Sequence, residues 1–188
     1  MRFLLIPDFA TPEECEELNR ICYSGFTAGW MTPVKNGKGL FTSRFEMTTK
    51  KYPDFVYAID YRVRKLLGIL SAPAVVGQGS RGIVVSSTPI GGIVYDHKDT
   101  VNSAGDYAIL RCNILTQAAH SGGELVIEGS KMKVPVGALH CYLASEHLHS
   151  VTEVHSGPDR ILWMFGAYVP AEDWNSGAIA PNIDKDRN

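Results

Sequence analysis

The hydrophobic pattern of the chain changes once, near residue 74. Before that point, two stretches repeat their apolar residues at three- and four-residue intervals, which is the spacing of one helix face. The first spans residues 11–23 and opens with Thr11-Pro12-Glu13-Glu14, a capping-box sequence. The second spans residues 53–67 and is followed by Gly68, which can end a helix. We therefore predict two N-terminal helices, each with one buried face.

After residue 74 the apolar residues come in short runs separated by glycine, proline, serine, asparagine or aspartate. Such runs are typical of antiparallel sheets that form sandwiches, barrels or jelly rolls. They lie at residues 74–77, 81–87, 90–97, 107–117, 123–128, 131–136, 138–144, 148–154 and 160–169. We predict a mainly β protein with flanking helices, a double-stranded β-helix (jelly roll) with the two N-terminal helices packed on one sheet. The length suits one domain, 1–188, with a jelly-roll core at about 74–169.

Two segments lack a regular period. Glycines and prolines interrupt residues 24–50, which predicts a long irregular segment. That segment could be a substrate lid or a surface loop anchored by a few aromatic residues. The tail, residues 170–188, contains prolines, a glycine and several charges, and we expect it to be loosely held.

Composition and charge narrow the class of protein. A net charge of −2 gives no general attraction to nucleic acid or to anionic membranes. No apolar run is long enough to cross a bilayer, and the first one is broken by Pro7, too early for a signal peptide. The four cysteines form no CxxC motif and are expected to be reduced core residues. We expect a cytoplasmic protein with no nucleic-acid or membrane partner; the sequence indicates no oligomeric state.

A candidate metal site begins at His97-Lys98-Asp99, which ends an apolar run. On an extended chain, residues two apart point to the same side. His97 and Asp99 can therefore supply two of the three ligands of a 2-His-1-carboxylate face, which suits non-haem Fe(II). Taken alone, the pair is equally compatible with a surface turn after a strand.

A third ligand and a buried cation follow later in the chain. His149 begins the alternation that continues at Val151, so we favour it over His147, which is expected in the preceding turn. Arg160 begins an apolar strand, where an arginine is costly unless it has an anionic partner. Its planar fork matches a carboxylate. The alternative is a strand-edge arginine in solvent.

Together these residues resemble the 2-oxoglutarate/Fe(II)-dependent dioxygenases, and the prolyl 4-hydroxylase-like branch in particular. That family has a His-x-Asp pair, a distal histidine and a basic residue about ten positions later. Here these are His97, Asp99, His149 and Arg160. Further segments look like the family's opening strand and helix, its Gly-Gly-Glu-Leu strand, the turn after it and its last ligand strand. They lie at Pro7–Cys15, Ser121–Ile127, Val134–Leu139 and His149–Gly157.

The resemblance covers about residues 3 to 169 and implies an oxidoreductase. His97, Asp99 and His149 would be the catalytic metal ligands of Fe(II). 2-Oxoglutarate would chelate the metal through its keto-acid end and pair with Arg160 through the other, while O2 takes the last position. Oxidative decarboxylation would release succinate and CO2 and hydroxylate an unactivated C–H bond. Ascorbate would serve such an enzyme as an accessory reductant. Family members that halogenate lack the carboxylate, so Asp99 favours hydroxylation.

Three more side chains are candidates for the cosubstrate pocket. Arg111 and Asn113 share one face of the run at 107–115, and that face points either into a pocket or into water. In similar enzymes this strand lines the cosubstrate site. Tyr95 shares the face of His97 and could contact cosubstrate or substrate, or simply pack at the rim. Trp163, on the last strand, is expected in the core.

Other functions remain open at this point. A cupin-like metal-binding protein without turnover has a similar fold, but cupins favour His-x-His, whereas Asp99 stands in the third place here. An AlkB-like nucleic-acid demethylase is disfavoured by the balanced charge and by the lack of a second arginine soon after Arg160. The third alternative is a structural β-domain in which the His/Asp pair occurs by chance. The expected substrate is an amino acid, a peptide or another small natural product.

Overall fold

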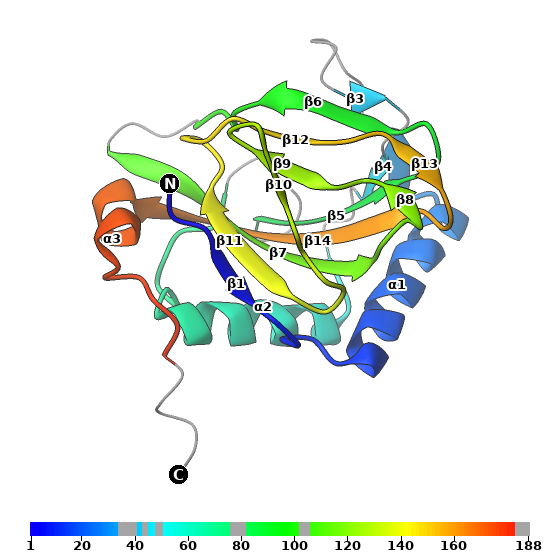
Figure 1. Ribbon diagram of the computed structural model, residues 1–188. Helices are drawn as coiled ribbons and strands as arrows, with labels where there is room; N and C mark the ends of the chain where they lie inside the picture. Colours follow the sequence, from blue (N-terminus) through cyan, green and yellow to red (C-terminus); the bar gives the residue numbers. More distant parts are fainter. Residues whose placement is uncertain (34–40, 43–44, 48–50, 76–81, 102–105, 183–188) are drawn as a thin grey trace.

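A computed structural model describes residues 1–33, 41–42, 45–47, 51–75, 82–101 and 106–182 (Figure 1). Two antiparallel sheets face each other. The larger has seven strands in the order β1-β11-β7-β14-β5-β4-β2, and the smaller has five in the order β10-β9-β12-β6-β3. The seven strands are β1 Leu4–Ile6, β2 Met31–Pro33, β4 Phe45–Met47, β5 Ile83–Thr88, β7 Tyr107–Gln117, β11 Leu139–Leu143 and β14 Arg160–Pro170.

The smaller sheet carries much of the candidate site. Its strands are β3 Phe41–Thr42, β6 Ile93–His97, β9 Leu125–Ile127, β10 Ser130–Met132 and β12 His149–Val151. A two-stranded ribbon, β8 Ser121–Gly122 with β13 Val154–Ser156, lies at one end of the structure. The architecture is mainly β, as predicted.

Two helices cover the outer face of the seven-stranded sheet (Figure 1). Helix α1, Pro12–Thr27, overlaps the range expected for the first helix and is longer. It begins with the expected capping box, because Thr11 and Glu14 exchange backbone–side-chain hydrogen bonds. Helix α2, Asp54–Leu67, ends at Gly68 in the left-handed conformation, which satisfies its last carbonyl groups.

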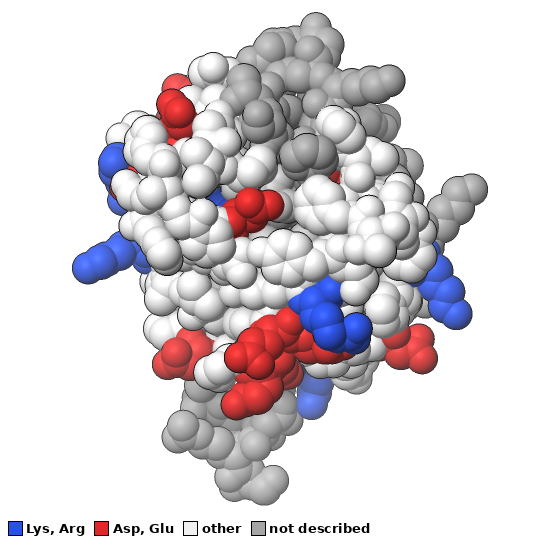
Figure 2. Space-filling view, turned by 90° about the vertical axis from the view of Figure 1, so that its right-hand side faces the viewer, with Lys and Arg blue, Asp and Glu red and all other residues white. Residues whose placement is uncertain are grey.

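The face that carries α1 shows acidic side chains gathered at its lower edge with basic groups beside them (Figure 2). Helix α1 opens with Glu13, Glu14, Glu16 and Glu17, and Glu17 forms an ion pair with Arg20. Exposed pairs of this kind contribute roughly 0–1 kcal/mol to stability. Their effect here is to keep this surface polar.

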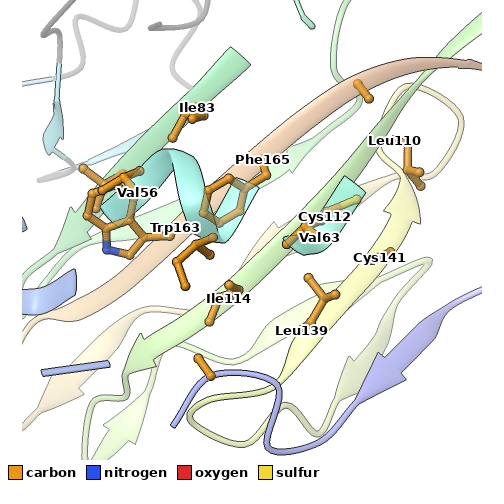
Figure 3. Close-up of a cluster of buried hydrophobic side chains, with 14 of the residues drawn as sticks. Val56, Val63, Ile83, Leu110, Cys112, Ile114, Leu139, Cys141, Trp163 and Phe165 are labelled. Atoms are coloured by element: carbon orange, nitrogen blue, oxygen red, sulfur yellow. The ribbon is translucent and has the colours of Figure 1, made fainter. Parts of the chain in front are cut away.

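Successive residues of the central strands point to opposite faces of the large sheet, apolar side chains to one face and mostly polar ones to the other. Cys112 and Ile114 of β7, with Trp163 and Phe165 of β14, point toward the helices into the main core (Figure 3). Trp163 is fully buried there, as predicted. The intervening positions face the space between the sheets, and they include Arg111, Asn113 and Arg160. The four cysteines are buried free thiols.

The prediction of an irregular segment at 24–50 was wrong for the part that the structure describes. Helix α1 continues to Thr27, and β2, β3 and β4 follow. Strand β4 pairs with β5 of the larger sheet, whereas β3 pairs with β6 of the smaller one. These strands have two or three residues each, too few to show a period. Residues 34–40, 43–44 and 48–50 lie outside the described residues, and with them part of the candidate lid.

The predicted loose tail was also wrong up to Asn182. Helix α3, Ala171–Ser176, places Trp174 in the core with no exposed surface. The guanidinium of Arg2 lies 4.3 Å from the centre of the Trp174 ring and donates to the Trp174 carbonyl. Asn182 donates its amide to the Leu66 carbonyl at 2.8 Å. Of the predicted strand at 74–77, only Ala74 forms a bridge, with Ala167, and residues 76–81 are not described.

No helix in the described part of the chain combines the length and the apolar character that a membrane span requires.

Candidate metal centre

The fold brings His97, Asp99 and His149 together on the smaller sheet. His97 ends β6, and Asp99 follows it by two residues. His149 begins β12, the neighbouring strand, directly opposite His97. One donor atom from each of the three residues lies within 4.8 Å of the other two. This group could hold a metal ion.

The donor atoms converge from three directions. Oδ1 of Asp99 is 3.7 Å from Nε2 of His97 and 3.8 Å from Nε2 of His149. Donors that bind one metal at about 2.1 Å in neighbouring positions lie roughly 3 Å apart. Oδ1 of Asp99 therefore stands within about 1 Å of the separation from each histidine nitrogen that a shared metal requires.

Backbone carbonyls fix the tautomer of both histidines. Nδ1 of His97 lies 2.8 Å from the Tyr95 carbonyl oxygen, and Nδ1 of His149 lies 3.0 Å from that of His147. A carbonyl only accepts, so each Nδ1 carries the proton and donates it. Each Nε2 therefore keeps a lone pair that faces the cluster, which is the usual outer arrangement of histidine ligands.

Arg111 holds the carboxylate of Asp99 from behind. Its Nε donates to Oδ2 of Asp99 at 2.7 Å, and its Nη2 forms an ion pair with the same oxygen at 2.7 Å, which leaves Oδ1 facing the histidines. Arg111 crosses Gly166, its neighbour on β14. A Cβ at position 166 would lie 3.3 Å from Nη1 of Arg111 and 2.9 Å from Cγ2 of Val75, so the absence of a side chain makes room for the guanidinium.

Electrostatics leave Asp99 and His149 in the protonation state of metal ligands. Burial by itself raises the pKa of Asp99, but the charge and hydrogen bond of Arg111 together with the two neighbouring histidines outweigh it, so the pKa lies below that of an ordinary aspartate. Burial lowers the pKa of His149 to about 4. Near pH 7, Asp99 is therefore ionised and His149 is neutral, so neither must lose a proton to bind a metal.

Arg160 is buried at the start of β14, opposite Thr88, with 4% of its surface exposed. Its side chain runs along Gly123, where an added Cβ would lie 3.1 Å from its Cδ. Leu162 and Met164, the next residues on the same face of β14, form an apolar cluster apart from the helix-facing core. Arg160 thus enters the space between the sheets rather than solvent.

The remaining sequence candidates occupy different places. Asn113 is buried on β7, and its Nδ2 lies 3.4 Å from Nε2 of His140. The Tyr95 side chain is 46% exposed, and only the backbone carbonyl of Tyr95 takes part in the cluster. The His147 side chain lies outside the cluster. Its Nδ1 is 3.6 Å from Oε1 of Glu128 instead.

Sequence reasoning missed two side chains of this interior, His140 and Tyr142. Both lie on β11 and are buried. The ring of Tyr142 meets His149 edge-on at 5.3 Å and stacks on His140 at 6.5 Å. The available signal was their two-residue spacing within the apolar run 138–144, which places both on the face opposite Cys141.

Fold and site together define a jelly-roll protein with a His/Asp/His cluster at one end of its smaller sheet. Solved structures with the same fold include prolyl hydroxylases. The viral collagen prolyl hydroxylase of Paramecium bursaria Chlorella virus-1, solved with 2-oxoglutarate, superposes with a TM-score of 0.62 at 17% identity, covering 90% of this chain and 97% of that one.

Two further structures share the fold. HygX from Streptomyces hygroscopicus, solved with nickel and 2-oxoglutarate, has a TM-score of 0.60 at 12% identity, covering 90% of this chain and 83% of that one. OsALKBH1 has a TM-score of 0.59 at 12% identity, with coverages of 88% and 98%. No protein-family model matches this sequence, and no curated protein sequence does. At these identities the likeness establishes the fold.

Proposed function

We propose that this chain is an Fe(II)- and 2-oxoglutarate-dependent oxygenase that hydroxylates an unactivated C–H bond and releases succinate and CO2. The observation that carries the proposal is the cluster of His97, Asp99 and His149, whose donor atoms converge with two tautomers already set. Two imidazoles and one carboxylate on one face are the ligand set of non-haem Fe(II) oxygenases. The fold shared with a prolyl hydroxylase solved with 2-oxoglutarate supports the same function.

The three residues of the cluster would hold Fe(II) through Nε2 of each histidine and Oδ1 of Asp99. When bound, the iron and 2-oxoglutarate supply the oxygen chemistry, whereas the protein binds, orients and shields the reactants. Arg111 keeps Oδ2 of Asp99 occupied, so the carboxylate presents a single oxygen. Because Asp99 fills the place that halogenating members of the family leave open, hydroxylation is the expected outcome.

Arg160 would bind the carboxylate of 2-oxoglutarate that is remote from the metal. It is a buried guanidinium between the sheets, and its fork matches a carboxylate in a bidentate pair. Arg111 and Asn113 would line the same pocket. Tyr95, exposed at the end of β6, would stand at the rim on the side from which a substrate enters.

The substrate we propose is an amino acid, a peptide or another small natural product. Two proteins with this fold support that range, a collagen prolyl hydroxylase and HygX, which has also been solved with hygromycin B bound. The fold alone does not separate these substrates from the nucleic acids expected of an AlkB-like enzyme, since OsALKBH1 shares it. The face in Figure 2 shows acidic side chains gathered at its lower edge with basic groups beside them, which disfavours a phosphate backbone there.

Succinate release tests the proposed function against the cupin-like alternative. Purified protein with Fe(II), 2-oxoglutarate and O2 is assayed against a panel of amino acids, peptides and nucleic acids. We expect at least one substrate to raise succinate release above the substrate-free rate in wild type and not in His97→Ala. His155→Ala, which removes an exposed histidine outside the cluster, is the matched control and should behave as wild type. Equal succinate release by wild type and His97→Ala throughout the panel contradicts the proposal.

A further inference from the structure

The interior contains a second buried histidine that the metal centre does not use. His140 of β11 lies directly opposite Asn113 of β7. The two residues are 1% and 2% exposed. Nδ2 of Asn113 lies 3.4 Å from Nε2 of His140, so the two side chains form a polar pair between the sheets.

Each member of this pair has one polar atom left over. Nδ1 of His140 and Oδ1 of Asn113 are buried and have no hydrogen-bond partner among the described residues. Buried polar atoms are almost always paired, because an unpaired one loses its bonds to water without replacement. Two such atoms on neighbouring strands indicate a position that a bound molecule completes.

The pair offers a hydrogen-bond donor to that molecule. An amide NH2 group only donates, so Nε2 of His140 accepts and Nδ1 carries the proton. Rotating the Asn113 amide by half a turn exchanges these roles and presents the amide NH2 instead. In both arrangements one N–H faces the interior. Burial, together with the charge of Arg160, lowers the pKa of His140 to about 3, so the imidazole is neutral.

The pair is also near both parts of the proposed site. Tyr142 stacks on His140 and meets His149, a residue of the metal cluster, edge-on. Arg160 is near enough for its charge to act on His140. The pair is therefore within the same interior as the two groups that would hold 2-oxoglutarate.

We propose that the His140–Asn113 pair donates one hydrogen bond to the carboxylate of 2-oxoglutarate that pairs with Arg160, one member as the donor and the other fixing the tautomer or the amide orientation. The assignment rests on the proposed function. A carboxylate has two oxygens and about four acceptor positions, and the two-pronged arginine fork fills only part of them. A neutral imidazole N–H or an amide N–H adds a further hydrogen bond to the anion without adding a second charge. His140 and Asn113 are thereby cosubstrate-binding residues, and they select for a 2-oxo acid with a distal carboxylate.

Binding of two 2-oxo acids to the Mn(II)-loaded protein tests this assignment. The probes are 2-oxoglutarate and 2-oxovalerate, in which a methyl group replaces the distal carboxylate. Titration calorimetry gives Kd for wild type, His140→Leu, His140→Asn and Asn113→Leu. We expect His140→Leu to raise Kd for 2-oxoglutarate by roughly 10- to 100-fold, the effect of one charge-assisted hydrogen bond. His140→Asn keeps a donor and should stay within about threefold of wild type.

The second probe and the metal separate binding from folding. Kd for 2-oxovalerate and Kd for Mn(II) should change by less than about twofold in His140→Leu, because neither ligand needs the distal donor. Asn113→Leu tests the other half of the pair and should also weaken 2-oxoglutarate selectively, whether or not His140→Leu folds.

The outcomes distinguish the two proposals. Unchanged affinity for 2-oxoglutarate in the folded His140 and Asn113 variants overturns the assignment while the proposed function stands. An equal loss of affinity for both 2-oxo acids also overturns it, because the effect would then be general. Wild-type Mn(II) protein that binds neither acid contradicts the proposed function itself.

Discussion

At the scale of single residues, the candidate site consists of three potential metal ligands and of the neighbouring groups that orient them. The histidines are oriented by the carbonyls of Tyr95 and His147, and Asp99 is oriented by Arg111. The His-x-Asp spacing indicated the ligands from sequence alone. The role of Arg111 could not be read that way, because the polar face of its strand fits a pocket and solvent equally well.

Replacing Arg111 with methionine should weaken metal binding. Asp99 would lose the hydrogen bond from Nε of Arg111 and its neutralising charge, so the pKa of the buried carboxyl would rise and Oδ1 would no longer be fixed. Loss of such a supporting contact typically costs about 10- to 100-fold in metal affinity. Titration with Mn(II) at pH 7 measures the effect, and Arg111→Lys, which keeps the charge without the fork, should fall in between. Tighter Mn(II) binding by Arg111→Met would show that repulsion by the cation dominates instead.

The two neutral buried histidines make the metal-free protein sensitive to mild acid. Burial lowers the pKa of His140 to about 3 and of His149 to about 4, against 6.5 for an ordinary histidine. Below pH 6.5 the unfolded chain binds protons at these sites and the folded chain does not, so stability is full above pH 6.5 and falls as the pH drops toward 4. The limiting slope is about 1.4 kcal/mol per pH unit for each histidine.

Urea unfolding of metal-free protein between pH 7 and pH 5 measures this slope. His140→Gln removes one titrating group, so its stability should fall less steeply than that of wild type. Parallel pH profiles for wild type and His140→Gln would show that His140 does not contribute.

At the scale of elements, sequence predicted the long strands well and the short ones poorly. The run 107–117 coincides with β7, and 160–169 falls one residue short of β14. Both are long apolar runs with clear boundaries. Strands β2, β3 and β4 depend on pairing with β5 and β6, which no local pattern encodes. His140 was missed because its strand is buried on both faces, which hides the alternation.

The same limit applies to α3, whose stability comes from packing. Trp174 is fully buried and lies against Arg2, at the far end of the chain. Trp174→Ala should therefore lower the free energy of unfolding by about 3–5 kcal/mol. Tyr61→Ala, which truncates an exposed aromatic residue of α2, should change it by less than about 0.5 kcal/mol. Chemical denaturation measures both, and similar small effects would mean that α3 is only loosely attached.

At the scale of the whole molecule, the two faces of the large sheet have different roles. One face packs on helices and is apolar, whereas the other carries Arg111, Asn113, His140 and Arg160 into the space between the sheets. Strand alternation encodes that division for Arg111, Asn113 and Arg160, so the sequence pointed to them as candidate pocket residues, and it did not point to His140. No pattern in the sequence marks the residues that would contact a substrate, so the substrate could be proposed only as a broad class.

The central claim is that one cluster binds Fe(II) and 2-oxoglutarate together. Anaerobic addition of both to the purified protein should produce the weak visible charge-transfer band of a 2-oxo acid chelated to Fe(II). We expect the band in wild type and in His155→Ala, and its loss in His97→Ala. Wild-type protein that binds Fe(II) but shows no band with saturating 2-oxoglutarate would contradict the account.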